Sequence, residues 1–113
     1  MEKITYKKFE QLFLGKKAVL IHFHQEEDKG SLIIQEHLKR LERTMQDELE
    51  IIHTNLRDGL FIADYLGKGI YPGLHLIKDQ ACQRSFDVKP ISFELLKFLI
   101  EEYTKEKEAT YVS

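Results

Sequence analysis

The chain has 113 residues, which is the size of a single domain with one hydrophobic core. Hydrophobic residues make up 42% of it and charged residues 32%, a balance typical of globular proteins and not of disordered ones. Seventeen basic residues against nineteen acidic ones give a net charge of -2, which argues against nucleic-acid binding, because that needs clustered positive charge. Because there is only one cysteine, an internal disulfide and a multi-cysteine metal site are excluded.

The sequence contains no targeting signal or membrane-spanning pattern. No apolar run approaches the roughly 18 residues of a membrane span. The N-terminus has no apolar stretch of the kind found in signal peptides. We therefore expect a cytoplasmic protein that consists of one domain over residues 1–113 and has no membrane partner.

A helix and a strand are predicted at the start of the chain. Residues 5–14 carry apolar side chains at helical spacing, with Thr5 placed as N-cap and Gly15 after the last turn. Residues 18–24 begin with four consecutive apolar residues and then alternate. This pattern predicts a strand that is buried on both faces of a sheet.

A second helix and a second strand follow a polar loop at residues 25–30. Ser31 is placed to cap a long helix that runs to about Gln46, and residues 49–53 read as a strand. Apolar residues recur along one face of that helix at helical spacing. They are Ile34, Leu38, Leu41 and Met45.

The third part of the chain predicts a short helix and a β-hairpin. Asp58 is placed to cap the helix, and Gly67 to end it. Residues 74–77 read as a strand, and Asp79-Gln80 as the turn into a last strand over residues 82–88. The hairpin therefore adds two antiparallel strands to the parallel pair that the first half of the chain predicts.

Ser92 is placed to cap a final helix, and residues 101–113 turn polar, so we expect a frayed C-terminal tail. The order of elements is helix, strand, helix, strand, helix, strand, strand, helix. This order predicts an α/β fold with a central mixed sheet of four to five strands, flanked by helices on both faces.

From these elements and three sequence blocks, the chain resembles the thioredoxin family over roughly residues 9–103. The first block, residues 18–23, is similar to the central strand before the family's active-site loop. The second, residues 71–79, is similar to the segment that contains the family's cis-proline, and the third, residues 95–99, to its closing helix. The resemblance implies a thioredoxin-like fold.

The chain departs from the family at the catalytic motif. The family's Cys-Gly-Pro-Cys falls on Asp28-Lys29-Gly30-Ser31, so both catalytic cysteines are replaced. Thiol–disulfide exchange needs a thiolate that attacks a disulfide, and neither Asp28 nor Ser31 supplies one. We therefore expect no catalytic residues and no cofactor. Asp28 retains an anion at a helix N-terminus, which the helix dipole stabilises by about 0.3–1 kcal/mol.

Histidines replace the charged pair that the resemblance would place beneath the active site. His22 falls on the family's buried acidic residue, His53 on its partner lysine, and His24 on a position that is often aromatic. Two neutral imidazoles can satisfy each other as donor and acceptor, which is one interpretation. The alternative is a metal or pH-sensing site formed by His22, His24 and His53 with Glu27 or Asp28.

The resemblance also implies a peptide-binding groove. In the family the proline that corresponds to Pro72 is cis, and the residue before it, here Tyr71, pairs its backbone with an extended substrate. The candidate binding residues lie on the two loops that border this groove. They are Glu27, Asp28, Tyr71, Pro72 and Gly73.

The expected function is therefore protein or peptide binding without redox activity, as an adaptor, a chaperone-like protein or an assembly factor. One alternative is an oxidoreductase-related protein that uses Cys82 or a cysteine of its partner. Cys82 falls in the last predicted strand, where we expect a small, half-buried residue. The other alternative is the histidine-based metal or pH-sensing site.

Overall fold

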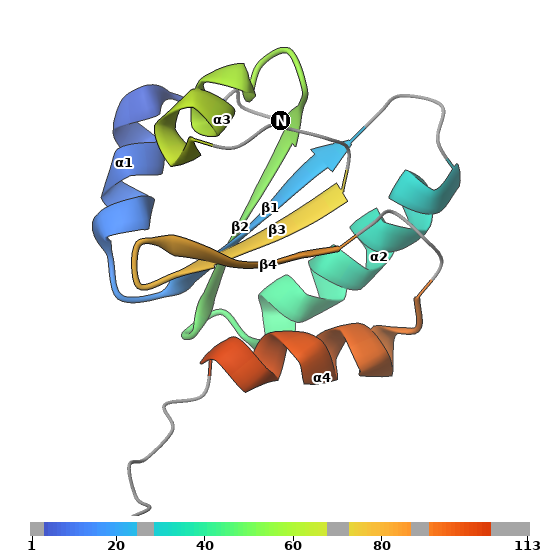
Figure 1. Ribbon diagram of the computed structural model, residues 1–113. Coiled ribbons are helices and arrows are strands. Elements are labelled where there is room, and N and C mark those ends of the chain that lie inside the picture. The colour runs from blue at the N-terminus through green and yellow to red at the C-terminus, as the bar shows by residue number, and fades with distance from the viewer. Residues whose placement is uncertain (1–3, 25–28, 68–72, 87–90, 105–113) are drawn as a thin grey trace, which may run out of the picture.

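A computed structural model of the chain describes residues 4–24, 29–67, 73–86 and 91–104. Its centre is a four-stranded sheet of order β2-β1-β3-β4 (Figure 1). The strands are β1 (Ala18–His24), β2 (Leu49–Asn55), β3 (Gly73–Lys78) and β4 (Ala81–Phe86). β1 pairs with β2 in parallel and with β3 antiparallel, and β4 pairs antiparallel with β3.

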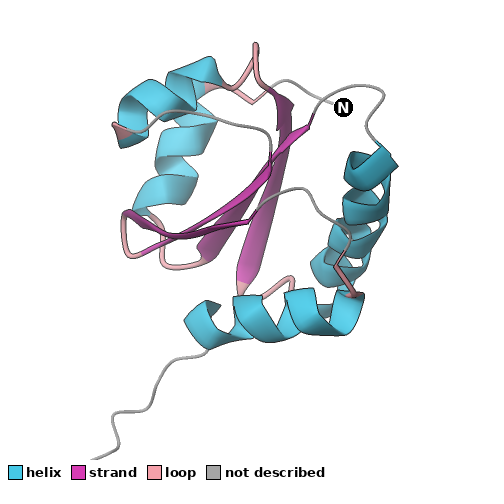
Figure 2. Ribbon diagram, turned by 45° about the vertical axis from the view of Figure 1, so that its right-hand side comes forward, coloured by secondary structure: helices cyan, strands magenta, loops and turns pink. Residues whose placement is uncertain are grey.

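Two helices cover each face of the sheet (Figure 2). α1 (Tyr6–Leu14) and α3 (Leu60–Leu66) lie on one face, whereas α2 (Lys29–Thr44) and α4 (Phe93–Thr104) lie on the other. Each layer has its own apolar cluster. This arrangement confirms the predicted α/β fold with a mixed sheet between two helical layers.

Burial follows the place of each strand in the sheet. β1 lies between two neighbours and two helical layers, and its first six residues, 18–23, are buried. Among the described strands β4 has a neighbour on one side only, and none of its residues is fully buried. The apolar stripe of α2 packs as predicted, since Ile34, Leu38 and Leu41 are each at most 1% exposed.

Most of the predicted helix ends are confirmed. The Thr5 hydroxyl accepts a hydrogen bond from the Lys8 amide at 3.2 Å, which satisfies one of the open donors of α1. The Ser92 hydroxyl does the same for the Leu95 amide in α4, also at 3.2 Å. Gly67 ends α3 in the left-handed conformation at φ 69°, which favours glycine.

Two predicted caps are wrong. α2 begins at Lys29, so Ser31 lies inside its first turn and not at its cap. Gly59 is the residue before α3, and no side chain caps that helix. Asp58 is instead held by Asn55: the Asp58 amide donates to Asn55 Oδ1 at 2.7 Å, and its Oδ2 accepts from Asn55 Nδ2 at 3.2 Å. This local pairing closes the turn after β2.

The hairpin and the last helix have slightly different bounds from those predicted. Asp79 and Gln80 have φ of 55° and 62°, as a two-residue hairpin turn requires, so the predicted turn is confirmed. The expected strand end at residue 88 lies outside the described residues. α4 continues to the buried Thr104, so residues 101–104 are helical, and residues 105–113 lie outside the described part.

Candidate functional site

One end of the sheet gathers the starts of three elements. Because β1 and β2 are parallel, their carboxyl ends lie at the same end, where the chain leads into α2 from one strand and into α3 from the other (Figure 1). β3 begins at this end as well, since its first residue, Gly73, pairs with Phe23 near the end of β1. Most of the predicted binding residues, Glu27, Asp28, Tyr71 and Pro72, lie outside the described residues, and so does the peptide bond before Pro72.

Gly73 is the one predicted binding residue that the structure describes. It is buried, and its φ is 147°, a backbone conformation that side-chain-bearing residues rarely adopt. Its place opposite Phe23 puts the start of β3 next to the carboxyl end of β1. Glycine therefore suits the backbone conformation at this point.

The first turn of α2 presents apolar side chains to solvent. The backbones of Lys29, Gly30 and Ser31 form the beginning of this turn. Leu32 and Ile33 follow, with exposed fractions of 62% and 44%. The sequence analysis did not single out these two residues, although both precede the buried stripe of α2 and fall outside its spacing.

On the other face, the start of α3 is packed tightly against β1 and β2. A Cβ atom at Gly59 would lie 2.7 Å from Phe23 Cε1 and 2.7 Å from Thr54 Cγ2. Leu60, the next residue, is 59% exposed. The sequence analysis missed Gly59 because the residues that leave no room for a side chain there, Thr54 and Phe23, are 5 and 36 positions away in sequence. A glycine next to a helix start does not indicate such contacts.

Three histidines lie together on the face of the sheet that α2 covers. His22 and His53 are register partners in β1 and β2, and His24 is two residues further along β1. The ring of His22 lies 5.7 Å from that of His53, edge to face, and 5.8 Å from that of His24, measured between centroids. His22 is fully buried. The ring of His22 therefore lies close to the rings of both other histidines.

The environment of His53 favours its neutral form. Burial is the main cause that lowers the pKa of His53 from its ordinary 6.5, and the neighbouring His24 and Lys39 lower it further. The Glu42 carboxylate on α2 opposes this shift. His53 Nδ1 is buried without a hydrogen-bond partner among the described residues, and the contact that joins its ring to His22 is an edge-to-face one. A protonated His53 would therefore be a poorly solvated cation.

Neither a metal centre nor a thiol site forms around these histidines in the described part of the chain. Within the described ranges, no three side chains of His, Cys, Asp or Glu are arranged to hold a metal ion. Cys82 pairs with Ile77, which itself pairs with Val19 near the start of β1. Because His24 is five positions after Val19 in β1, Cys82 lies about 17 Å along the sheet from the α2 end.

Cys82 and the two remaining histidines have ordinary structural contacts. Cys82 is half-buried, as expected, and its Sγ lies 3.7 Å from the Ser85 hydroxyl. His75 Nδ1 shares a hydrogen bond of 2.8 Å with the same hydroxyl. His37 Nε2 donates to the Ile91 carbonyl at 2.8 Å and so ties α2 to the segment before α4.

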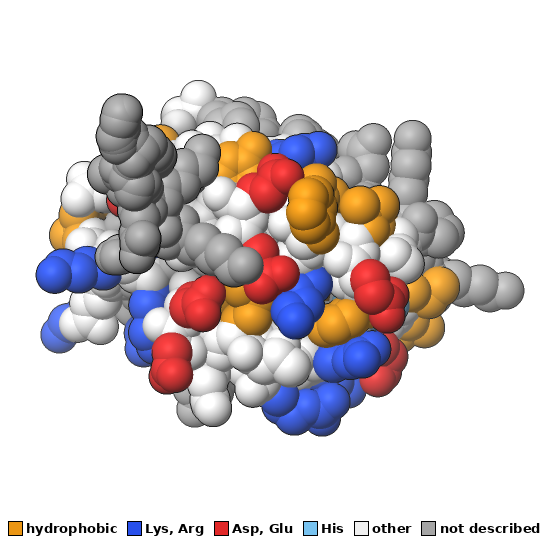
Figure 3. Space-filling model, turned by 90° about the horizontal axis from the view of Figure 1, so that it is seen from below, with side chains coloured by type: hydrophobic (Ala, Val, Ile, Leu, Met, Phe, Trp, Pro, Cys, Tyr) orange, Lys and Arg blue, Asp and Glu red, His pale blue; other side chains and the backbone are white. Residues whose placement is uncertain are grey.

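The face of the molecule seen from below, where α4 lies, carries acidic and basic side chains interspersed with apolar ones (Figure 3). Two exposed apolar residues of α4, Leu95 and Phe98, are 49% and 58% exposed. This face therefore offers no uniformly basic surface. None of the helices in the described part is long and apolar enough to cross a membrane.

Comparison with solved structures defines the class of fold. The chain is similar to a mutant thioredoxin from Halobacterium salinarum NRC-1, with TM-score 0.72, 18% identity, and coverage of 89% of this chain and 87% of that one. It is similar to the thioredoxin of Malassezia sympodialis (TM-score 0.70, 18% identity, 89% of each chain). It is also similar to mitochondrial thioredoxin 3 of Saccharomyces cerevisiae (TM-score 0.65, 16% identity, 85% and 88%).

These likenesses establish a thioredoxin-like fold and confirm the fold that the resemblance implied. No protein-family model matches the chain, and no curated protein matches it by sequence. A fold hosts many functions, so the activity has to be argued from the residues at the site.

Proposed function

We propose that this protein is a redox-inactive, thioredoxin-like binding protein. It holds an extended protein or peptide segment at the end of the sheet where α2, α3 and β3 begin. In a cell, a protein with this binding activity would act as an adaptor, a chaperone-like protein or an assembly factor.

The observation that carries the proposal is the position of the only cysteine. Disulfide exchange starts with attack by a thiolate, and release of the mixed disulfide needs a second thiol. The chain has one cysteine in 113 residues, and that cysteine, Cys82, lies near the opposite end of the sheet from the start of α2. The thioredoxin-like scaffold is thus retained without the chemistry of the dithiol.

Exposed apolar side chains at the α2 end support a binding role. Leu32, Ile33 and Leu60 are each more than 40% exposed, and all three lie in the first turns of helices that start at this end. Exposed apolar side chains beside the end of a sheet suit the binding of an extended peptide. The backbone of the peptide can form hydrogen bonds, and its side chains can contact the exposed apolar side chains.

A binding experiment with matched variants tests the location of the site. A library of extended peptides is screened on the wild-type protein, and the best binders are then measured by fluorescence anisotropy. We expect Leu32→Asp, and separately the double variant Asp28→Lys, Tyr71→Ala, to weaken binding tenfold or more. Leu95→Asp changes a leucine on α4 that is also about half exposed, and it serves as control. Equal effects of Leu32→Asp and Leu95→Asp, or no binder at all, would contradict the proposal.

A reductase assay separates this proposal from the alternative that uses Cys82. We expect no reduction of insulin disulfides above the rate of dithiothreitol alone, for both the wild type and Cys82→Ser. A thiol-dependent rate that disappears in Cys82→Ser would favour the alternative function, in which Cys82 attacks a disulfide of the substrate.

The contacts among His22, His24 and His53 favour a second candidate function, which is a binding activity that responds to pH. Burial and the neighbouring His24 lower the pKa of His53, and the charged groups of α2 that act on it are Glu42, which raises this pKa, and Lys39, which lowers it. Peptide affinity measured from pH 7.5 to 5.5 tests this candidate. A pH dependence that persists unchanged in His53→Gln would contradict it.

A further inference from the structure

The helices α1 and α3 bring three aromatic side chains together at the surface of the molecule. The two helices lie side by side on one face of the sheet (Figure 1). The ring of Tyr6, at the start of α1, lies 5.9 Å from that of Phe61 and 5.7 Å from that of Tyr65, measured between centroids. Tyr6 is 53% exposed, and the other two are half-buried. We call these three residues the aromatic ridge.

A buried ring holds the ridge in place from beneath. Phe9 is fully buried, and its ring lies 6.0 Å from that of Phe61 and 5.2 Å from that of Tyr65, edge to face in both pairs. Aromatic pairs favour this arrangement because the positive edge of one ring meets the negative face of the other. The ridge is therefore a preformed surface, and a ligand that stacks on it does not have to order the rings first.

Two carboxylates lie beside the ridge. Glu10 is four positions after Tyr6 on α1, and Asp64 is three positions after Phe61 on α3, so each shares a helix face with a ring of the ridge. Partial burial raises the pKa of the Tyr6 hydroxyl, and the negative charge of Glu10 raises it further. Glu10 is therefore close enough to act on the Tyr6 side chain.

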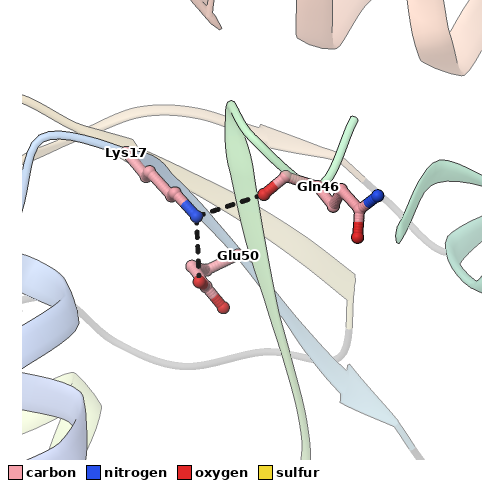
Figure 4. A network of polar contacts seen from close by, with 3 residues as sticks. All are labelled: Lys17, Gln46 and Glu50. Carbon is pink, nitrogen blue, oxygen red and sulfur yellow. Dashed lines mark hydrogen bonds and ion pairs between the residues drawn. The ribbon is translucent and has the colours of Figure 1, made fainter. Parts of the chain in front are cut away.

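Neither carboxylate pairs with a Lys or Arg side chain in the part of the chain that the structure describes. Glu50, near the opposite end of the sheet, shows the contrasting case (Figure 4). The Lys17 ammonium lies 3.5 Å from Glu50 Oε1 and also donates to the Gln46 carbonyl at 3.1 Å. The charges of Glu10 and Asp64 therefore remain available to a cation from a binding partner.

We propose that the aromatic ridge, with Glu10 and Asp64 beside it, binds a cationic side chain of the bound peptide segment, arginine in preference to lysine. An aromatic face attracts a cation, and a carboxylate strengthens the hydrogen bonds that the cation donates. A guanidinium is planar, so it stacks on a ring and presents a fork of donors to a carboxylate. The basic residues of α1, Lys7 and Lys8, come one and two positions after Tyr6 and so lie on other sides of the helix.

This inference rests on the proposed function, because the cation belongs to the segment that binds at the end of the sheet. The ridge continues that site along α3, since Phe61 directly follows the exposed Leu60. The partner is then an extended segment that combines apolar side chains, which contact the exposed residues at the helix starts, with a basic residue that reaches the ridge. A segment without a basic residue leaves the two carboxylates without a partner.

A titration with a capped arginine tests the ridge by itself. N-acetyl-arginine amide is added to the full chain, and the ring resonances of Tyr65 are followed by NMR. A single side chain offers few contacts, so we expect a saturable shift with a millimolar dissociation constant. N-acetyl-norleucine amide, which lacks the charge, should cause no such shift. A wild-type protein that shows no saturable shift with arginine at 50 mM, or equal shifts with both compounds, would overturn the proposal.

Matched variants locate the cation in the same titration. We expect Tyr6→Leu and Glu10→Gln each to raise the dissociation constant of the capped arginine threefold or more. Glu50→Gln removes a carboxylate that Lys17 already engages, so it should leave that constant unchanged. Circular dichroism establishes that each variant is folded, and Asp64→Asn, at an exposed position, replaces Glu10→Gln if that variant is not. Equal effects of Glu10→Gln and Glu50→Gln would contradict the proposed location.

The peptide library that tests the proposed function also tests the chemistry of the partner. Among peptides selected on the wild type and on Glu50→Gln, we expect arginine to be enriched threefold or more over the unselected library. The enrichment should disappear on the double variant Glu10→Gln, Asp64→Asn. Binders without enriched arginine would overturn this inference and leave the proposed function standing. An absence of binders would contradict the proposed function instead, and the titration then decides whether the ridge binds a cation.

Discussion

Substitution of Gly59 by alanine isolates the effect of one methyl group at the end of the sheet. The added Cβ would lie 2.7 Å from carbons of both Phe23 and Thr54, about 1 Å inside the usual contact distance of 3.5–4.0 Å. Phe23 is 2% exposed and Thr54 5% exposed, so neither side chain can turn out into solvent. The backbone at Gly59, φ -98° and ψ 8°, is open to alanine, so the clash is the only direct cost.

The expected magnitude follows from two opposing effects. Overpacking of a closed site costs about 1–3 kcal/mol. Replacement of glycine restricts the unfolded chain and returns about 0.4–1 kcal/mol. We therefore expect Gly59→Ala to lower the free energy of unfolding by roughly 1–2 kcal/mol, which corresponds to a melting temperature about 4–8 °C lower for a domain of this size. Thermal and urea unfolding followed by circular dichroism measure both quantities.

Two further variants decide whether the clash is the reason. At Gly15 an added Cβ meets only carbonyl oxygens of α1 at 3.4 Å, so Gly15→Ala should change stability by less than about 0.5 kcal/mol. Thr54→Ser removes Cγ2 and with it one of the two close contacts, so Gly59→Ala combined with Thr54→Ser should lose less than the sum of the single variants. A Gly59→Ala protein that melts within 1 °C of the wild type would refute the reasoning.

Three other outcomes are expected. Burial lowers the pKa of His53 in the folded state, so its contribution to stability is fully present above about pH 6.5. That contribution is lost as the pH falls from 6.5 through the lower pKa of the folded state. In urea titrations, the stability advantage of the wild type over His53→Gln should therefore shrink between pH 7.5 and 5.5. Ser92→Ala removes the hydroxyl that caps α4 and should cost about 1 kcal/mol, whereas Ser92→Asp should retain most of the stability in the same assay. Leu38→Ala opens a cavity at a fully buried position and should cost about 2–5 kcal/mol, and a loss below 1 kcal/mol would contradict the packing of α2 on the sheet.

Local sequence signals determined the elements and most of their ends. The run of apolar residues at 18–23 predicts a central strand because only a strand covered on both faces buries consecutive side chains. Thr5, Ser92 and Gly67 act within one turn of their own helix, so their roles follow from nearby residues alone. The absence of a second cysteine is likewise a property of the sequence, and it is enough to exclude a dithiol mechanism within one chain.

The caps that were predicted wrongly show where local signals compete. Ser31 and Asp58 both have side chains that favour a helix start. α2 begins two residues before Ser31, and the carboxylate of Asp58 pairs with Asn55 across the turn, where it is no longer available to α3. Several residues before a helix can act as its N-cap. Which of them does so depends on the path of the backbone between the preceding strand and the helix.

Tertiary structure alone decided what lies near what. The requirement for glycine at position 59 comes from Phe23 and Thr54, which lie on two different strands. The distance of Cys82 from the start of α2 follows from the pairing registers of β1, β3 and β4. The exposure of Leu32 and Ile33 likewise depends on which surfaces other elements leave uncovered. The sequence by itself determined the strands and the helices, because those depend on neighbours within a few residues, and its composition shows that the chain has a single cysteine. Sites and interfaces depend on contacts between distant segments, which exist only once the chain has folded.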